Sequence, residues 1–292
     1  MMDVTQSITS MVFIASGGYG NYNALYATFR ARDYHGLTAT SNFTWGRALG
    51  TGAVTQASSA ITREDAFNIN ADYGPNPFDY KFLYNMALSW ETPWYKTQHG
   101  IFGHIVGGWI FSSVFTAQSA GGEAVAYNEN GLCGGGCQAF GESSSSGISS
   151  NTEEAVAAAP YTGGGTRAHY NVAGSSSVGT NNPTGVNQFA NPAEVYSEFR
   201  PCILGFDTSC GGYFNIRGLP WWNVDAGALK DIGVWKEGRV GATLSFQITN
   251  VMNHVVFTGA SSLNLSTMSQ FGRITGQSNI PRNMEFGLRI HF

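Results

Sequence analysis

Charged residues are scarce in this 292-residue sequence, at 12% of the chain, and the formal net charge is −4. A slightly acidic balance offers no basic surface to a phosphate backbone, so nothing indicates nucleic acid as a partner. No run of 18 apolar residues occurs, which excludes a transmembrane helix. Glycine, in contrast, is plentiful, with 38 residues. This combination suits a lipid-facing β-barrel, in which alternation with polar residues dilutes the apolar ones.

Catalytic motifs are missing as well. The sequence contains no H-E-x-x-H, P-loop, G-x-S-x-G or EF-hand spacing, and its six histidines are scattered. Asp225 and Asp231 share one face of an expected strand, where a solvated barrel interior is the preferred interpretation and a cation site the alternative. Glu285 and Arg289 are expected to pair across strands rather than act on a substrate. We therefore expect neither enzymatic activity nor a cofactor.

An export signal is not evident near the amino terminus. Residues 1–17 contain no basic region, and their apolar stretch, residues 11–15, is short for a signal peptide. An outer-membrane protein must be exported. The sequence is therefore interpreted as either a mature protein or a fragment whose signal lies further upstream.

Cysteine is rare, and the four residues form two close pairs, Cys133 with Cys137 and Cys202 with Cys210. Both pairs lie in the longest segment without strand periodicity. The simplest interpretation is two local disulfides in an oxidising compartment, each worth about 2–3 kcal/mol in the chain-entropy model. A zinc site of four thiolates is the alternative, although the C-x3-C and C-x7-C spacings are poor for a zinc knuckle.

Alternation of apolar and polar residues is the strongest positive signal, and it is cleanest over residues 282–292. A period of two indicates a β-strand with one apolar and one polar face. The segment also has the length of about 9–11 residues that a tilted strand needs to cross a bilayer. Because an open sheet edge is not tolerated in lipid, such strands form closed barrels.

The alternation recurs upstream and predicts an antiparallel all-β fold with seven strands, at residues 22–31, 37–47, 80–92, 101–117, 221–233, 239–251 and 282–292. Residues 4–14 could add an eighth. Single-chain bacterial barrels have even strand numbers, so either the eighth strand is real or the chain is part of a larger barrel. A soluble β-sandwich also alternates. However, these strands are long, their polar face carries Gly, Ser, Thr and Asn, and Trp and Tyr lie at strand ends as in an interfacial girdle.

Long and short connections alternate along the chain. The long ones are residues 49–79, 121–217 and 253–281. Outer-membrane barrels have short periplasmic turns and long extracellular loops, so we expect the long connections outside the cell and the carboxyl terminus in the periplasm. The chain is thus described as one barrel segment, residues 1–292, interrupted by an extracellular Gly/Ser-rich loop, residues 121–217. Such a composition is not expected to bury a core of its own.

Short motifs in the carboxyl-terminal half are more specific. They comprise Arg217, Gly218, Trp222, Asn223 and Asp225, then Asn250, Asn253 and His254, and finally Phe271, Gly272, Pro281 and Arg282. Together they resemble segments of TonB-dependent outer-membrane receptors, and most closely the Oar-like branch, whose full chains begin with a carboxypeptidase-regulatory-like domain. Residues 21–25, 35–37 and 44–47 are similar to an earlier hairpin of that branch. The resemblance covers nearly the whole chain except the long loop.

The resemblance implies a 22-stranded barrel with a plug and a TonB box. The predicted strands would be its last seven, and the missing amino-terminal strands and plug, or other chains, would complete it. The implied function is solute binding and TonB-dependent uptake, with the solute unknown. The alternative is a self-contained or multichain eight-stranded barrel with a structural, pore or adhesion role.

The resemblance also implies two partners, outer-membrane lipid and the barrel-insertion machinery. That machinery would read the outward residues of the terminal strand, which are Phe286, Leu288, Ile290 and Phe292.

Overall fold

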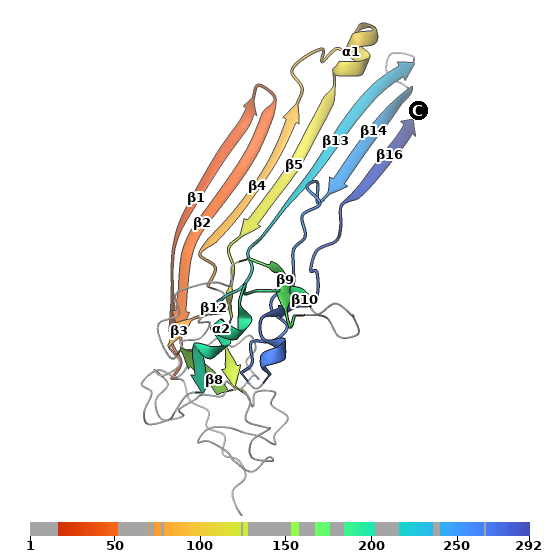
Figure 1. The fold of residues 1–292 in the computed structure, drawn as a ribbon. Coiled ribbons are helices and arrows are strands. Elements are labelled where there is room, and N and C mark those ends of the chain that lie inside the picture. The colour runs from red at the N-terminus through yellow and green to blue at the C-terminus, as the bar shows by residue number, and fades with distance from the viewer. Residues whose placement is uncertain are drawn as a thin grey trace, which may run out of the picture.

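The structure, a computed structural model (Figure 1), describes residues 17–51, 70, 73–76, 79–123, 125–127, 153–157, 167–175, 184–201, 216–235, 240–265 and 267–292. A long antiparallel sheet dominates it, with the strand order β1-β2-β4-β5-β13-β14-β16. These strands are β1 (Gly20–Tyr34), β2 (Leu37–Gly50), β4 (Phe82–Glu91), β5 (Trp109–Gln118), β13 (Trp221–Trp235), β14 (Val240–Thr249) and β16 (Asn283–His291). The short β3 (Gly74–Pro75) pairs with the end of β2.

The register sorts the alternating residues into apolar and polar rows across the sheet. One row consists of Leu37, Trp90, Phe111, Ala228, Phe246 and Phe286. The next row consists of Thr38, Ser89, Ser112, Gly227, Gln247 and Glu285. Because a slip of one residue would exchange the two faces, the hydrophobic pattern specifies this register. The predicted two-faced sheet is confirmed, and we call its sides the apolar face and the polar face.

The predicted strands agree with the observed ones except at residues 101–108. Gly100–Val106 form a helix, α1, and β5 begins only at Trp109. Ile101, Phe102, Ile105 and Val106 follow an i, i+1, i+4, i+5 spacing, which is helical. The prediction of a strand over this part of residues 101–117 was therefore wrong. The possible eighth strand, residues 4–14, lies outside the described residues.

Both edges of the sheet are open in the described part of the chain. There, β1 pairs only with β2, and β16 pairs only with β14. Figure 1 shows the seven long strands side by side, with the short connections at one end and the long connections gathered at the other. Within the described residues, no helix has both the length and the apolar character needed to span a membrane.

The long connections fold together into what we call the loop cap. Its elements are β6 (Gly122–Glu123), β7 (Ala126–Tyr127), β8 (Glu153–Ala157), β9 (His169–Ala173), β10 (Thr184–Asn187), α2 (Pro192–Ser197), β11 (Phe199–Pro201), β12 (Ile216–Arg217), η3 (Met268–Gln270) and β15 (Arg273–Ile274). They form three small sheets, ordered β15-β10-β9, β11-β8-β7 and β12-β6. The pairing of β15 with β10 joins the third long connection to the second.

The loop cap has a hydrophobic core, made of Val125, Phe189, Phe199, Ile216, Leu265 and Phe271. The second long connection, residues 121–217, contributes the first four of these side chains. The sequence predicts no core of the loop's own, and these four side chains are buried in a core that the loop shares with residues 253–281. Its apolar residues lie between the Gly/Ser tracts, and the tracts at 134–136, 143–146 and 163–165 lie outside the described residues.

Candidate functional site

The turn after β14 is organised by Asn250, which is buried. Its Nδ2 donates to the carbonyls of His254 (2.9 Å) and Ile280 (3.2 Å), and its Oδ1 accepts from the His254 amide (2.8 Å). Its own amide donates to Asp225 Oδ1 (2.8 Å), which ties the turn to β13. The φ angle of 53° is left-handed, a conformation that asparagine tolerates better than most residues. One residue, through its side chain and its backbone amide, thus connects three segments of chain.

Other motif residues meet at the same place. The rings of Trp222 and His254 stack with centroids 4.2 Å apart. Asn253 Oδ1 accepts from the Arg282 amide (3.1 Å), and Asn279 Nδ2 donates to the His254 carbonyl (2.7 Å). The structure therefore brings together residues of all three motifs at the loop ends of β13, β14 and β16, a region we call the junction. Pro281, beside Arg282, is exposed.

A partly buried ion pair fastens the loop cap to the β2–β4 side of the sheet. Both terminal nitrogens of Arg217 donate to Asp79, one to its carbonyl and one to its carboxylate. The Asp79 side chain is fully buried, and its Oδ1 also accepts from the Ala48 amide of β2 (2.7 Å). Gly218 continues the connection, since its amide donates to the Gly121 carbonyl (2.9 Å). Arg217 thus links β12 to the β2–β4 loop.

Beside this pair lies a partly buried carboxylate, Glu123 of β6. Its Oε2 accepts from Gln188 Nε2 (2.5 Å), which also donates to the Arg217 carbonyl (3.2 Å). Burial raises the pKa of Glu123 above its ordinary value of 4.5, and the hydrogen bond from Gln188 offsets part of that rise. The Gln188 Oε1 has no hydrogen-bond partner within the described residues.

The raised pKa of Glu123 makes the stability of the loop cap depend on pH. Between 4.5 and the raised pKa, the folded cap binds the proton more tightly than the unfolded chain does. The stability that Glu123 contributes to the folded cap is therefore fully present below pH 4.5. It is lost as the pH rises from 4.5 through the raised pKa.

Phe271 and Gly272 belong to the core of the loop cap. The Phe271 ring stacks on Phe189 at 5.6 Å and meets Tyr196 edge-on at 5.4 Å. Gly272 has φ 70°, and a Cβ there would approach Asn187 Oδ1 to 2.5 Å, so a larger residue does not fit. Sequence reasoning missed Asn187, Gln188 and Phe189, because they lie in a polar segment without periodicity.

The polar face carries amides and hydroxyls in hydrogen-bonded rows. Tyr26 and Thr28 both donate to Asn42 Oδ1 (2.8 and 3.0 Å), and Asn42 Nδ2 donates to Asn85 Oδ1 (2.8 Å). Asn223 Nδ2 in turn donates to Asp225 Oδ1 (2.8 Å). Such a surface matches the hydrated interior of a barrel.

The acidic residues of this face do not converge. Asp225 accepts from Asn223 and Asn250, whereas Asp231 accepts from the Thr243 hydroxyl. Within the described residues, no three His, Cys, Asp or Glu side chains gather closely enough to hold a metal ion. The two aspartates are therefore separate members of the polar face.

The charged residues of the last strand lie opposite polar residues of β14. Glu285 is opposite Gln247, and Arg289 is opposite Thr243.

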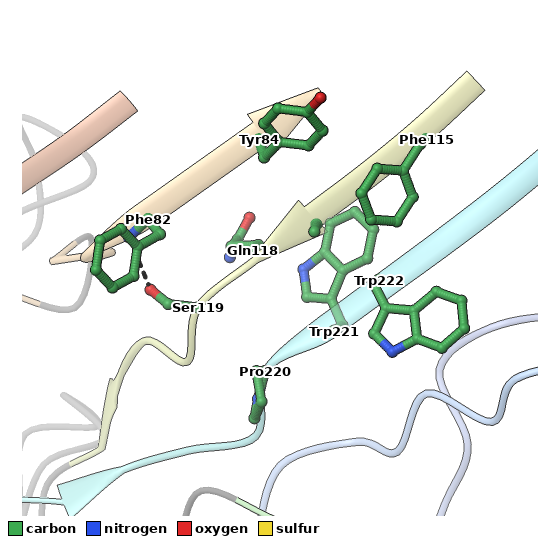
Figure 2. Close-up of a pocket in the computed structure, with 9 residues that line it drawn as sticks. Phe82, Tyr84, Phe115, Gln118, Ser119, Pro220, Trp221 and Trp222 are labelled. Carbon is green, nitrogen blue, oxygen red and sulfur yellow. Dashed lines mark hydrogen bonds between the residues drawn. The ribbon is translucent and has the colours of Figure 1, made fainter. Parts of the chain in front are cut away.

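Two apolar hollows lie on the apolar face. The first, of about 550 Å³, is lined by aromatic side chains including Phe82, Tyr84, Phe115 and Trp222 at the loop end of β4, β5 and β13 (Figure 2). The second, of about 540 Å³, lies between β5 and β16 and includes Phe246. Because both lie among outward rows, they suit contact with acyl chains better than with a polar solute.

The residues predicted as the barrel-assembly signal lie in and just after the terminal strand, β16. Phe286, Leu288 and Ile290 share the apolar face, Phe292 follows the end of the strand, and all four are exposed. Their role in recognition by the barrel-insertion machinery stays a prediction. The four cysteines, Cys133, Cys137, Cys202 and Cys210, lie outside the described residues, so neither disulfides nor a zinc site can be located there.

Comparison with known proteins agrees with this architecture. A family model described as an outer membrane beta barrel domain matches residues 3–285. No curated protein and no solved structure matches the chain. The match extends over almost the whole sequence; it includes the six long strands from β1 to β14 and the first three residues of β16. The chain therefore belongs to the outer membrane β-barrel domain family.

Proposed function

We propose that the chain forms part of the wall of a larger transport barrel, whose loop cap binds a solute and whose complete form takes it up with TonB energy. The observation that carries this proposal is the open sheet. In the described residues, β1 and β16 each leave one edge without a partner. Unpaired backbone groups are not tolerated in lipid, so further strands must pair with these edges.

Solute binding is supported by the loop cap itself. The cap has its own core, and it is fastened to the strands at Arg217 and at Asn250. A rigid surface at the end of a barrel can present fixed groups to a solute. The polar face, with its rows of amides and hydroxyls, would then line the path inward.

The TonB-dependent step is supported by the motif resemblance alone. The proposed orientation is an extracellular loop cap, with the short connections and the carboxyl terminus in the periplasm. It is supported by the usual asymmetry of outer-membrane barrels. A strain without the gene should lose uptake of a labelled solute from a panel of oligosaccharides, peptides and metal chelates, and a tonB deletion should cause the same loss. Uptake that survives the tonB deletion would contradict energised transport.

The size of the barrel can be tested by crosslinking its edge strands. In the larger barrel, a cysteine replacing Glu285 in β16 is far from residues 4–14 and forms no disulfide with single cysteines placed along that segment. A closed eight-stranded barrel made of this chain alone would use residues 4–14 as the strand between β1 and β16, so one of these cysteine pairs would be joined. Cysteines replacing Thr28 and Asn42 are the positive control, because these residues are paired in the register. An intramolecular disulfide between residues 4–14 and β16 on a non-reducing gel would replace the proposal with the small barrel.

An extracellular loop cap also requires oxidised cysteines. Non-reducing peptide mapping should show Cys133 joined to Cys137, and Cys202 joined to Cys210. Free thiols with bound zinc would indicate the four-thiolate site instead. Free thiols without a metal, together with no cleavage of the loop by protease on intact cells, would place the loop inside the cell and overturn the orientation.

A further inference from the structure

Helix α1, in the connection between β4 and β5, exposes its large apolar residues and buries a glycine. Its large apolar residues point outward, with Ile101 79%, Phe102 77% and Ile105 63% exposed. Its buried residue is Gly103. At Gly107, which follows the helix, a Cβ would lie 2.0 Å from the Tyr95 carbonyl oxygen. The helix therefore packs closely on the preceding turn through glycine and presents its apolar side chains to the surroundings.

The carboxyl end of α1 is tied to the apolar face of the sheet. Trp109 Nε1 donates to the Ile105 carbonyl (2.9 Å). Lys230 Nζ donates to the carbonyls of Ile105 (3.1 Å) and Gly107 (2.6 Å), and it lies 5.0 Å from the centroid of the Trp109 ring. A cation at a helix carboxyl terminus satisfies free carbonyls and complements the helix dipole.

Lys230 is a charged residue on the apolar face of the sheet. It lies in an apolar row between Trp109 and Leu244, and it is buried. A lysine on the lipid-facing side of a barrel is costly unless its amine finds partners or reaches the interface. The α1 carbonyls supply those partners. Lys230 therefore holds α1 against the sheet at the end of the lipid-facing band.

The surroundings of α1 resemble the border of a membrane. Trp94 and Tyr95 are exposed beside it, and Trp94 meets Trp90 edge-on at 5.5 Å. Tryptophan and tyrosine favour the level of the lipid headgroups. Helix α1 lies beyond the ends of β4 and β5 (Figure 1), so its exposed apolar side chains extend the apolar surface past these strands.

We propose that α1 is a membrane-interface anchor, with Ile101, Phe102 and Ile105 inserted among glycerophospholipids of the inner leaflet of the outer membrane. A short helix with one apolar side lies in the plane of the interface in this way. The lipid contact rests on the family and the apolar face, whereas the choice of leaflet rests on the proposed orientation.

Photocrosslinking in native outer membranes tests the anchor directly. The photoreactive residue p-benzoylphenylalanine replaces Phe102 in the full-length protein, and adducts are identified by mass after illumination. A glycerophospholipid adduct is expected. A protein adduct would show that a periplasmic partner covers α1 and would overturn the proposal. An adduct with lipid A would place α1 in the opposite leaflet and would overturn it too.

Two further positions distinguish failure of this anchor from failure of the barrel assignment. Phe286 lies on the apolar face, so the same probe there should also give lipid adducts. Lys96 forms an exposed ion pair with Glu91 (3.3 Å), so a probe at Lys96 should give far fewer. Lipid adducts at Phe286 without any at Phe102 would refute the anchor and leave the barrel intact. No adducts at either position would refute both.

Two variants test the role of Lys230. Lys230→Met keeps an unbranched apolar stem and removes the amine, so the barrel should insert normally while the lipid adduct at Phe102 decreases. Lys230→Arg, which retains the donors, should keep the adduct yield. Heat-modifiable migration on gels checks insertion. An unchanged yield in Lys230→Met would show that Lys230 does not hold the helix.

Discussion

The two faces of the sheet predict opposite responses to the same added charge at adjacent residues of β14. Phe246 lies in an apolar row, and its ring stacks on Phe286 with centroids 4.5 Å apart. Gln247 lies in the neighbouring polar row, opposite Glu285. Phe246→Arg places a guanidinium in lipid, whereas Gln247→Arg places one in the hydrated interior beside a carboxylate.

The expected magnitudes differ by several kcal/mol. An arginine on the lipid side near the midplane costs about 2–4 kcal/mol. Loss of the aromatic pair with Phe286 adds about 0.5–1.5 kcal/mol. Gln247→Arg should instead be near neutral, because a cross-strand pair of opposite charges contributes about 0.2–1 kcal/mol of stabilisation.

Equilibrium unfolding in urea, with the full-length protein folded into phospholipid vesicles, measures both free energies. Phe246→Leu is the matched control, because it removes the ring but keeps an apolar side chain. The free energy of unfolding of Phe246→Leu should fall only by the contribution of the aromatic pair with Phe286. Equal losses for the two arginine variants, or a larger loss for Gln247→Arg, would mean that the faces are assigned wrongly or that the sheet does not face a bilayer.

Four further predictions concern the loop cap, the junction and the terminus. Arg217→Met should destabilise the cap by about 3–5 kcal/mol, measured by hydrogen exchange, because the Asp79 carboxylate would stay buried without its partner. Glu123→Gln should abolish the loss of cap stability as the pH rises above 4.5, again by hydrogen exchange, since the amide stays neutral. Asn250→Ala should cost about 2–4 kcal/mol in urea unfolding, because it removes three hydrogen bonds of about 0.5–1.5 kcal/mol each. Deletion of Phe292 should lower the amount of heat-modifiable protein in the outer membrane, and unchanged levels would contradict its role in assembly.

The long strands could be predicted from the sequence because their physics is local. A strand in a barrel wall needs one apolar and one polar face, and a period of two records both. The same pattern determines the register, since every slip by one residue would exchange lipid and interior. The prediction fails at residues 101–106 because this segment directly precedes an alternating strand, whereas its own apolar residues have helical spacing.

The loop cap could not be predicted, because its contacts are not local. Phe189 stacks on Phe271, and Arg217 binds Asp79 across 138 positions of sequence. A single apolar residue in a polar segment carries no periodic signal, so its burial depends on a partner far along the chain. Asn250 was selected as part of a motif, but its hydrogen bonds to three segments follow only from the structure.

The strands and the junction constrain their residues in different ways. Lipid requires only that an outward side chain be apolar, and many side chains meet that requirement. The junction has to satisfy the backbone of irregular turns with specific groups, as Asn250 does for His254 and Ile280. Asp225 couples this turn to β13, whose polar face would line the transport path. In the proposed transport function, the junction would be the route by which a solute bound to the loop cap influences the barrel interior, and it is where the most specific motifs of this sequence are found.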